Sequence, residues 1–71
     1  MDEITVSVVE DVPEIREGMR FMINQMPGFR CVAVYGNAQD AIRGMKEATP
    51  DMAIVDIGLP GMSGAECIRR L

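Results

Sequence analysis

The sequence predicts an α/β fold in which helices flank a parallel sheet. Three short apolar runs of strand type alternate along the 71 residues with segments whose apolar residues recur at helical spacing. The resulting order, β-α-β-α-β-α, requires a crossover between successive strands, and such crossovers are right-handed and give parallel strands. At this length the chain is expected to form one small domain at most.

The first strand is predicted at Ile4–Val9, a β-branched and nearly continuous run that suits a strand covered on both faces. Pro13, a residue favoured in the first turn of a helix, follows it. The next apolar residues form one helical stripe, made of Val12, Ile15, Met19, Met22, Ile23 and Met26. Pro27 and Gly28 are expected to end this helix.

The second strand and helix follow the same pattern. Phe29–Tyr35 is predicted to be a strand that Gly36 breaks, and Asn37 is expected to cap the next helix, with Asp40 at the reciprocal capping-box position. The predicted inner face of this helix consists of Ala38, Ala41, Ile42, Met45 and Ala48. Thr49 and Pro50 are expected to end the helix.

The third strand is predicted at about residues 51–56, and a Gly/Pro-rich loop follows at residues 57–62. Ser63 with Glu66 three residues later is a second capping box. It predicts the start of a third helix that the chain leaves incomplete at Leu71.

Composition excludes several classes of protein. The net charge is −4, from 11 acidic and 7 basic residues, and no basic cluster exceeds the pair Arg69-Arg70, so a nucleic-acid-binding role for this segment is not expected. The chain begins Met-Asp-Glu and has no apolar run long enough to cross a membrane, which predicts a cytoplasmic protein. Cys31 and Cys67 are interpreted as small buried thiols, and the seven methionines mainly as core-filling residues.

Acidic residues end the first and third strands. Glu10 and Asp11 follow the first run, and Asp56 follows the third. The carboxyl ends of parallel strands meet at one edge of a sheet, where α/β proteins bind ligands. Three oxygen ligands without a nearby His or Cys suit Mg²⁺, and the arrangement indicates a phosphoryl-transfer site.

Each acid also has an ordinary alternative role, because an Asp before a helix is often its N-cap and an Asp at the end of a strand often caps a turn. The glycines after Asp56 are in part ordinary turn residues. They also let the backbone approach an ion, with the carbonyl of Gly58 well placed as a ligand.

The acids and the loop after Asp56 carry a resemblance to a known family. Glu10-Asp11, the strand-terminal Asp56 and the nine-residue run Asp-Ile-Gly-Leu-Pro-Gly-Met-Ser-Gly at residues 56–64 resemble the receiver domain of bacterial two-component response regulators. The spacing of 45 residues between Asp11 and Asp56 fits that family. The loop is similar to those of receivers joined to LuxR-type DNA-binding domains.

The resemblance implies a truncated flavodoxin-like (CheY-like) sheet with strands in the order 2-1-3. It implies that Asp56 accepts a phosphoryl group from a sensor histidine kinase, so that the chain is a switch and not an enzyme. Asp11 and Asp56 would bind Mg²⁺ directly, with the Gly58 carbonyl as a further ligand and Glu10 acting through water. A competing interpretation, an aspartyl-phosphate phosphatase, would call for a second Asp two residues after the nucleophile, where this chain has Gly58.

Receivers of this family are longer, so residues 1–71 are expected to be the N-terminal part of one, with three strands, two full helices and the start of a third. The alternative is a truncated, signalling-dead fragment that only folds and self-associates. In the order 2-1-3 the third strand is an edge that lacks protective Lys or Pro residues. A homodimer or higher oligomer through this strand is therefore expected.

Overall fold

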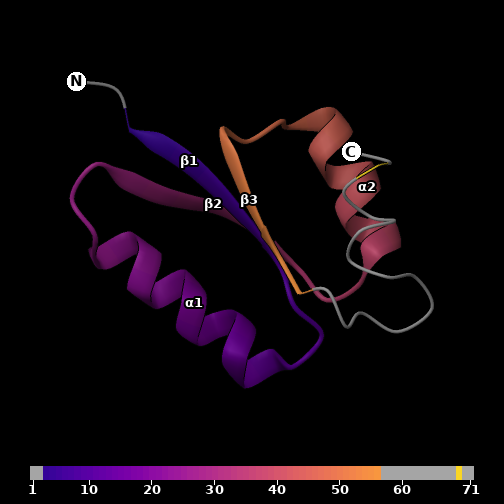
Figure 1. Cartoon of the computed structure of the whole chain (residues 1–71), viewed down its shortest axis with the longest axis horizontal. Coiled ribbons are helices and arrows are strands. Elements are labelled where there is room, and N and C mark those ends of the chain that lie inside the picture. Colours follow the sequence, from indigo (N-terminus) through magenta and orange to yellow (C-terminus); the bar gives the residue numbers. More distant parts are fainter. Residues whose placement is uncertain (1–2, 57–68, 70–71) are drawn as a thin grey trace.

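The computed structural model describes residues 3–56 and residue 69. Along this part of the chain lie β1 (Ile4–Val9), α1 (Pro13–Gln25), β2 (Phe29–Tyr35), α2 (Ala38–Glu47) and β3 (Met52–Val55) (Figure 1). The strands form one sheet in the order β2-β1-β3, and both pairings are parallel. The predicted order 2-1-3 is confirmed. The third helix expected from Ser63 lies outside the described residues.

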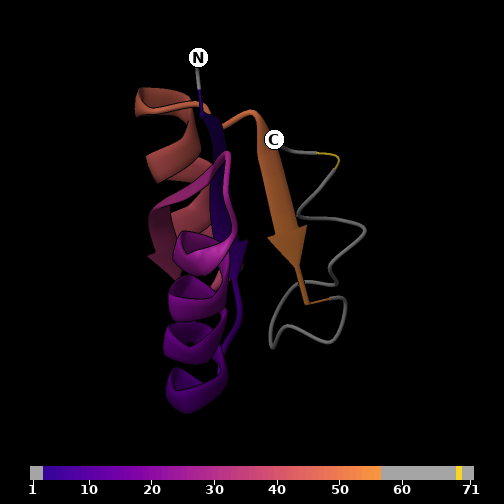
Figure 2. The same ribbon diagram turned by 90° about the vertical axis from the view of Figure 1, so that its left-hand side faces the viewer.

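The central strand β1 is covered on both faces, which explains why its sequence is apolar almost throughout. One buried cluster, on the α1 side of the sheet, consists of Val6, Val8 and Ile23. The other, on the α2 side, consists of Val9, Ala38, Ala41 and Met45. The two helices thus lie on opposite faces of the sheet, as Figures 1 and 2 show.

A register shift separates the two halves of β2. The pairing of β1 with β2 shifts after Val6, and Val32 is left without a Cα partner on β1. An extra residue of this kind moves the side chains that follow it to the opposite face. Tyr35 therefore packs in the α2-side cluster, whereas strict alternation from Cys31 would place it on the α1 side.

The two helices begin differently. The first residue of α1 is Pro13, and Val12 occupies the N-cap without a side-chain hydrogen bond. At α2 the predicted cap is confirmed, because the Asn37 side-chain oxygen accepts a hydrogen bond from the Asp40 amide at 2.8 Å. The Asp40 carboxylate accepts from the Asn37 side-chain amide and from Arg43, and these two hydrogen bonds, that of Arg43 foremost, lower its pKa.

The predicted inner stripe of α1 was too wide. Ile23 is buried, but Ile15, Met22 and Met26 are exposed. Viewed from the α1 side, β3 stands beside this helix and not behind it (Figure 2). Between the two lies a hollow of about 170 Å³, and the described residues that line it are all apolar: Met19, Met22, Ile23, Met26 and Ile54.

Three further predictions about individual side chains need correction. Ala48, expected on the inner face of α2, is exposed and forms the C-cap of that helix. The methionines are core-filling only in part, since Met45 is buried whereas Met52 on β3 is 46% exposed. Cys31, expected to be a buried thiol, is free and only half-buried. Cys67 lies outside the described residues. In the part of the chain that the structure describes, neither helix has the length and apolar character needed to cross a membrane.

A hydrogen-bonded pair closes the amino-terminal end of the sheet. The Asp51 carboxylate accepts hydrogen bonds from the Thr5 amide at 2.8 Å and from the Thr5 hydroxyl at 3.0 Å. The Thr5 hydroxyl in turn accepts from the Asp51 amide at 2.9 Å. These bonds, that to the Thr5 amide foremost, lower the pKa of Asp51. We call this arrangement the Thr5–Asp51 clamp; it joins β1 to the start of β3.

Candidate functional site

The strand register brings the predicted acidic residues together. Val9 on β1 lies opposite Val55 on β3, so the residues that follow them, Glu10 and Asp56, leave the sheet side by side. The Asp56 amide donates to the Val9 carbonyl at 2.9 Å and extends the ladder by one residue. The parallel pairing of two strands, each followed by an acid, is thus the local cause of the cluster.

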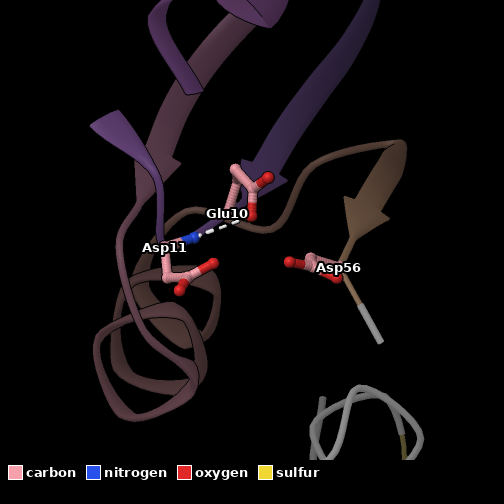
Figure 3. A group of neighbouring side chains, drawn as sticks. All are labelled: Glu10, Asp11 and Asp56. Carbon is pink, nitrogen blue, oxygen red and sulfur yellow. Dashed lines mark hydrogen bonds between the residues drawn. The ribbon is translucent and has the colours of Figure 1, made fainter. Parts of the chain in front are cut away.

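Three carboxylates share this edge of the sheet. Glu10, Asp11 and Asp56 each offer an oxygen atom within 4.8 Å of the others. Figure 3 shows the side chains of Asp11 and Asp56 pointing toward one another, with that of Glu10 beside them. Glu10 is buried, Asp56 is half-buried and Asp11 is exposed, so the cluster opens to solvent on the Asp11 side.

The proximity of the other carboxyl groups raises the pKa of Glu10. A side-chain hydrogen bond with Asp56 raises the pKa of Glu10, and burial adds to this effect. One side-chain oxygen of Glu10 accepts a hydrogen bond from the Asp11 amide at 2.9 Å, which opposes the rise. Carboxyl groups this close favour a shared proton or a bound cation, because both relieve the repulsion between them.

The structure removes one alternative role and leaves one predicted ligand untested. Asp11 does not cap α1, because Val12 holds that position without a side-chain hydrogen bond. The Gly58 carbonyl, predicted as a further metal ligand, lies outside the described residues.

The donor set fits a hard divalent cation. The cluster offers only carboxylate oxygens, which are the ligands that Mg²⁺ prefers in proteins. A small number of protein carboxylates also agrees with the tendency of Mg²⁺ to retain several waters.

The residues that hold the main chain of Glu10 could not be identified from the sequence pattern. Its amide donates to the Tyr35 carbonyl at 2.9 Å. Its carbonyl accepts from a guanidinium nitrogen of Arg16 at 3.0 Å. Nothing in the sequence pattern separates Arg16 from Arg20, which lies one turn later on the same helix.

Comparison with known proteins gives a consistent result over nearly the whole chain. The family model of the response regulator receiver domain matches residues 6–71. A putative transcriptional regulator of Pseudomonas aeruginosa is 38% identical over 66 residues, which are 93% of this chain and 31% of that protein. A protein-glutamate methylesterase/protein-glutamine glutaminase of Nitrosospira multiformis is 35% identical over 63 residues, 89% of this chain and 18% of that protein.

Solved structures agree with the fold. A two-component response regulator of the LuxR family from Aurantimonas sp. SI85-9A1 matches with a TM-score of 0.89 and 38% identity, over 96% of this chain and 49% of that one. The signal receiver domain of the putative response regulator NarL from Mycobacterium tuberculosis matches with a TM-score of 0.87 and 28% identity, over 94% and 54%. The chain thus spans about half of these solved chains, and less of the curated relatives.

Proposed function

Because the chain belongs to the family of response regulator receiver domains, we propose that it is a phosphoacceptor of two-component signalling, with Asp56 as the acceptor and Mg²⁺ as the cofactor. In this proposal residues 1–71 are the N-terminal part of a receiver domain, and the chain is a switch that acts in the cytoplasm. Its only chemical reaction is the transfer of a phosphoryl group onto itself.

One observation carries the proposal. Two parallel strands deliver three carboxylates to one edge of the sheet, within 4.8 Å of one another. Of these, Glu10 is buried and already accepts a hydrogen bond from the Asp11 amide, whereas Asp56 ends β3 and remains half-buried. A nucleophile must be reachable by its donor and held in position, and Asp56 meets both conditions.

The reaction is a displacement at phosphorus. An oxygen of the Asp56 carboxylate attacks the phosphorus of a phosphohistidine on a sensor histidine kinase, the new O–P bond forms as the P–N bond breaks, and the imidazole leaves with a proton from solvent. The chain contributes mainly by holding the nucleophile in line with the leaving group and by excluding competing geometries.

Asp11 and Asp56 would hold the cation directly, with Glu10 acting through water and the Gly58 carbonyl as a further ligand. When bound, Mg²⁺ supplies positive charge that offsets repulsion between the carboxylates and the phosphoryl oxygens.

A small phosphodonor tests the acceptor assignment. Incubation with acetyl phosphate and Mg²⁺ is expected to add one phosphoryl group to the chain, and Asp56→Asn is expected to abolish the addition, as read by intact mass. The matched control is Glu47→Gln, which removes an exposed carboxylate at the end of α2, outside the acidic cluster, and should be modified like the unchanged chain. Full phosphorylation of Asp56→Asn would contradict the assignment.

The relatives suggest the wider context. One is a putative transcriptional regulator and one solved neighbour is a LuxR-family response regulator, which supports a parent protein with a DNA-binding output domain. We place no nucleic-acid contact on the present segment, because its net charge is −4.

The alternative function, a fragment that only folds and self-associates, has an observation of its own. Within the described residues β3 pairs with β1 alone. Its Met52 and Ile54 side chains are exposed, and Ile54 lines the apolar hollow next to α1. Such an edge favours pairing with another strand. We therefore propose a homodimer or higher oligomer through β3. A monomer mass by light scattering at high micromolar concentration would contradict it.

A further inference from the structure

Arg16 occupies an unusual position for a surface arginine. Its amide makes a helical hydrogen bond at the start of α1, to the Val12 carbonyl at 2.9 Å. Its side chain runs back toward the end of β1, where a terminal guanidinium nitrogen donates to the Glu10 carbonyl at 3.0 Å, and the residue is half-buried. Arg16 thus joins α1 to the turn that carries Glu10 and Asp11.

Other arginines of the described chain serve a different purpose. The guanidinium groups of Arg20 and Arg30 pair with exposed carboxylates, those of Glu17 at 3.5 Å and Glu3 at 3.3 Å. Within residues 3–56 and residue 69, no carboxylate lies within 4.0 Å of the Arg16 guanidinium. The Arg16 guanidinium donates to the main-chain carbonyl of Glu10 instead.

The space around Arg16 supports this assignment. A Cβ atom added at Gly36 would lie 2.9 Å from the terminal nitrogen and 3.6 Å from the central carbon of the guanidinium. The guanidinium therefore occupies the volume that a side chain at Gly36 would fill. It sits where α1, the end of β1 and the turn between β2 and α2 meet.

Three contacts then determine the orientation of Glu10. Its amide is held by the Tyr35 carbonyl and its carboxylate by the Asp11 amide, both at 2.9 Å. The third contact, from Arg16 to the carbonyl, is the one that depends on a side chain of α1. Because the peptide unit between Glu10 and Asp11 is planar, fixing this carbonyl also fixes the amide of Asp11, which holds the Glu10 carboxylate.

We propose that Arg16 is a positioning residue, whose guanidinium holds the Glu10 carbonyl and thereby presents the Glu10 and Asp11 carboxylates to Asp56 and to a divalent cation. The effect of Arg16 on the cation rests on the function proposed above. Its effect on the turn that carries Glu10 and Asp11 does not, because that effect is expected in the metal-free chain. Arg16 acts through the acids and has no assigned contact with the phosphoryl group.

The first experiment needs no metal. Amide hydrogen exchange is measured by NMR in the metal-free chain and in Arg16→Gln, well below the melting temperature. Exchange at the Asp11 amide is expected to become several-fold faster, while exchange at Val8, in the centre of β1, stays unchanged. Arg20→Gln is the matched control and should leave both amides unchanged. Equal exchange at Asp11 in Arg16→Gln and the unchanged chain would overturn the proposal.

The second experiment titrates the same proteins with MgCl₂, followed by the amide shifts of Asp11 and Asp56. Loss of a residue that orients metal ligands typically lowers metal affinity about 10–100-fold. We expect a decrease of about tenfold in Arg16→Gln and none in Arg20→Gln. Unchanged affinity in Arg16→Gln would overturn the link to the cation. If the unchanged chain itself fails to bind Mg²⁺, the proposed cofactor is wrong, and the exchange measurement still decides the role of Arg16.

Gly36→Ala provides an independent variant that leaves Arg16 in place. Its new Cβ should displace the guanidinium and produce the same local increase in exchange at Asp11 as Arg16→Gln. In the double variant Arg16→Gln/Gly36→Ala the second substitution should add no further increase, because nothing remains to be displaced. Additive effects of the two substitutions would contradict the shared mechanism. This variant also decides the question if Arg16→Gln fails to fold.

Discussion

The two ends of the β1–β3 pair hold carboxylates in opposite electrostatic situations. At the amino-terminal end, Asp51 accepts hydrogen bonds from the amide and hydroxyl of Thr5, and its pKa is lowered. At the carboxyl-terminal end, Glu10 lies beside Asp56, and its pKa is raised, foremost by the hydrogen bond between the two carboxyl groups and next by burial. The same two strands carry both arrangements.

The difference separates a carboxylate that stabilises the fold from carboxylates whose mutual repulsion destabilises it. An ionised carboxylate that meets donors is more stable in the folded chain than in water, whereas carboxylates that meet one another are less stable. Groups with raised pKa values at the edge of a sheet are typical of functional sites. Substitution at the two ends should therefore change stability in opposite directions.

The largest effect is expected at the Thr5–Asp51 clamp. Asp51→Ala removes the acceptor of two hydrogen bonds, so that the start of β3 stays tied to β1 only by the ladder and by the hydrogen bond from the amide of residue 51 to the Thr5 hydroxyl. We expect the melting temperature to fall by several degrees in a thermal melt followed by circular dichroism. Asp51→Asn keeps an acceptor oxygen and should recover part of the loss. An unchanged melt of Asp51→Ala would show that the clamp does not stabilise the sheet.

A smaller effect of opposite sign is expected at Asp11. Asp11→Asn removes one negative charge from the cluster, so the metal-free melting temperature should rise. The same variant should lose most of the gain that Mg²⁺ gives the unchanged chain, because ligand binding to the folded state raises stability by mass action. Melts in chelator and in excess Mg²⁺ measure both changes. A metal-free decrease would contradict the comparison.

The pH dependence should differ between the two ends. The raised pKa of Glu10 means that the folded chain takes up a proton before the unfolded chain does, so metal-free stability should rise as the pH falls through the folded pKa toward 4.5. The lowered pKa of Asp51 has the opposite consequence, a loss of stability as the pH falls below about 3.8.

Urea titrations across the acidic range measure this profile. A stability maximum on the acidic side is expected in chelator. Excess Mg²⁺ should flatten the rise, because cation and proton relieve the same repulsion. Stability that falls steadily from neutral pH in chelator would count against the raised pKa.

The smallest effect is expected at the ion pair between Arg30 and Glu3, which lies near the amino-terminal end of the sheet. Both side chains are more than half exposed, at 57% and 53%, and exposed pairs contribute at most about 1 kcal/mol. Arg30→Gln should therefore change the free energy of unfolding very little. A change as large as that of Asp51→Ala would mean that charge alone, without the geometry of the clamp, stabilises this end.

The sequence was sufficient for the order of elements and for the acidic cluster. Strand-type runs and helical spacing identify the elements up to β3, and the order 2-1-3, which the family resemblance implied, then requires that acids after β1 and β3 meet. The first inference depends on local patterns, and the second adds the strand order of the resembled family and the rule that parallel strands end at one edge of a sheet.

Other features depend on contacts that leave no local pattern. Thr5 and Asp51 are 46 residues apart and look like ordinary strand-end residues. The strand Phe29–Tyr35 is apolar at most positions, so no alternation indicates that the register shifts at Val32. Gly44 lies in the middle of α2 because a Cβ there would collide with the phenol ring of Tyr35.

The width of the α1 stripe was overestimated for a related reason. Periodicity indicates which residues share a face of a helix, but burial depends on what the sheet places beneath each of them. Ile23 lies against β1, whereas Met22 and Met26 border the hollow beside β3.

The hollow between α1 and β3 is lined in part by methionines, whose oxidation can be measured. Met22 and Met26 are 64% and 45% exposed, and exposed thioethers are converted by peroxide to sulfoxides that mass spectrometry can locate. A polypeptide that covered the hollow would shield them, while the buried Met45 would remain protected in either case. The chain therefore carries an internal footprinting probe, with its own reference residue, for whatever packs between α1 and β3.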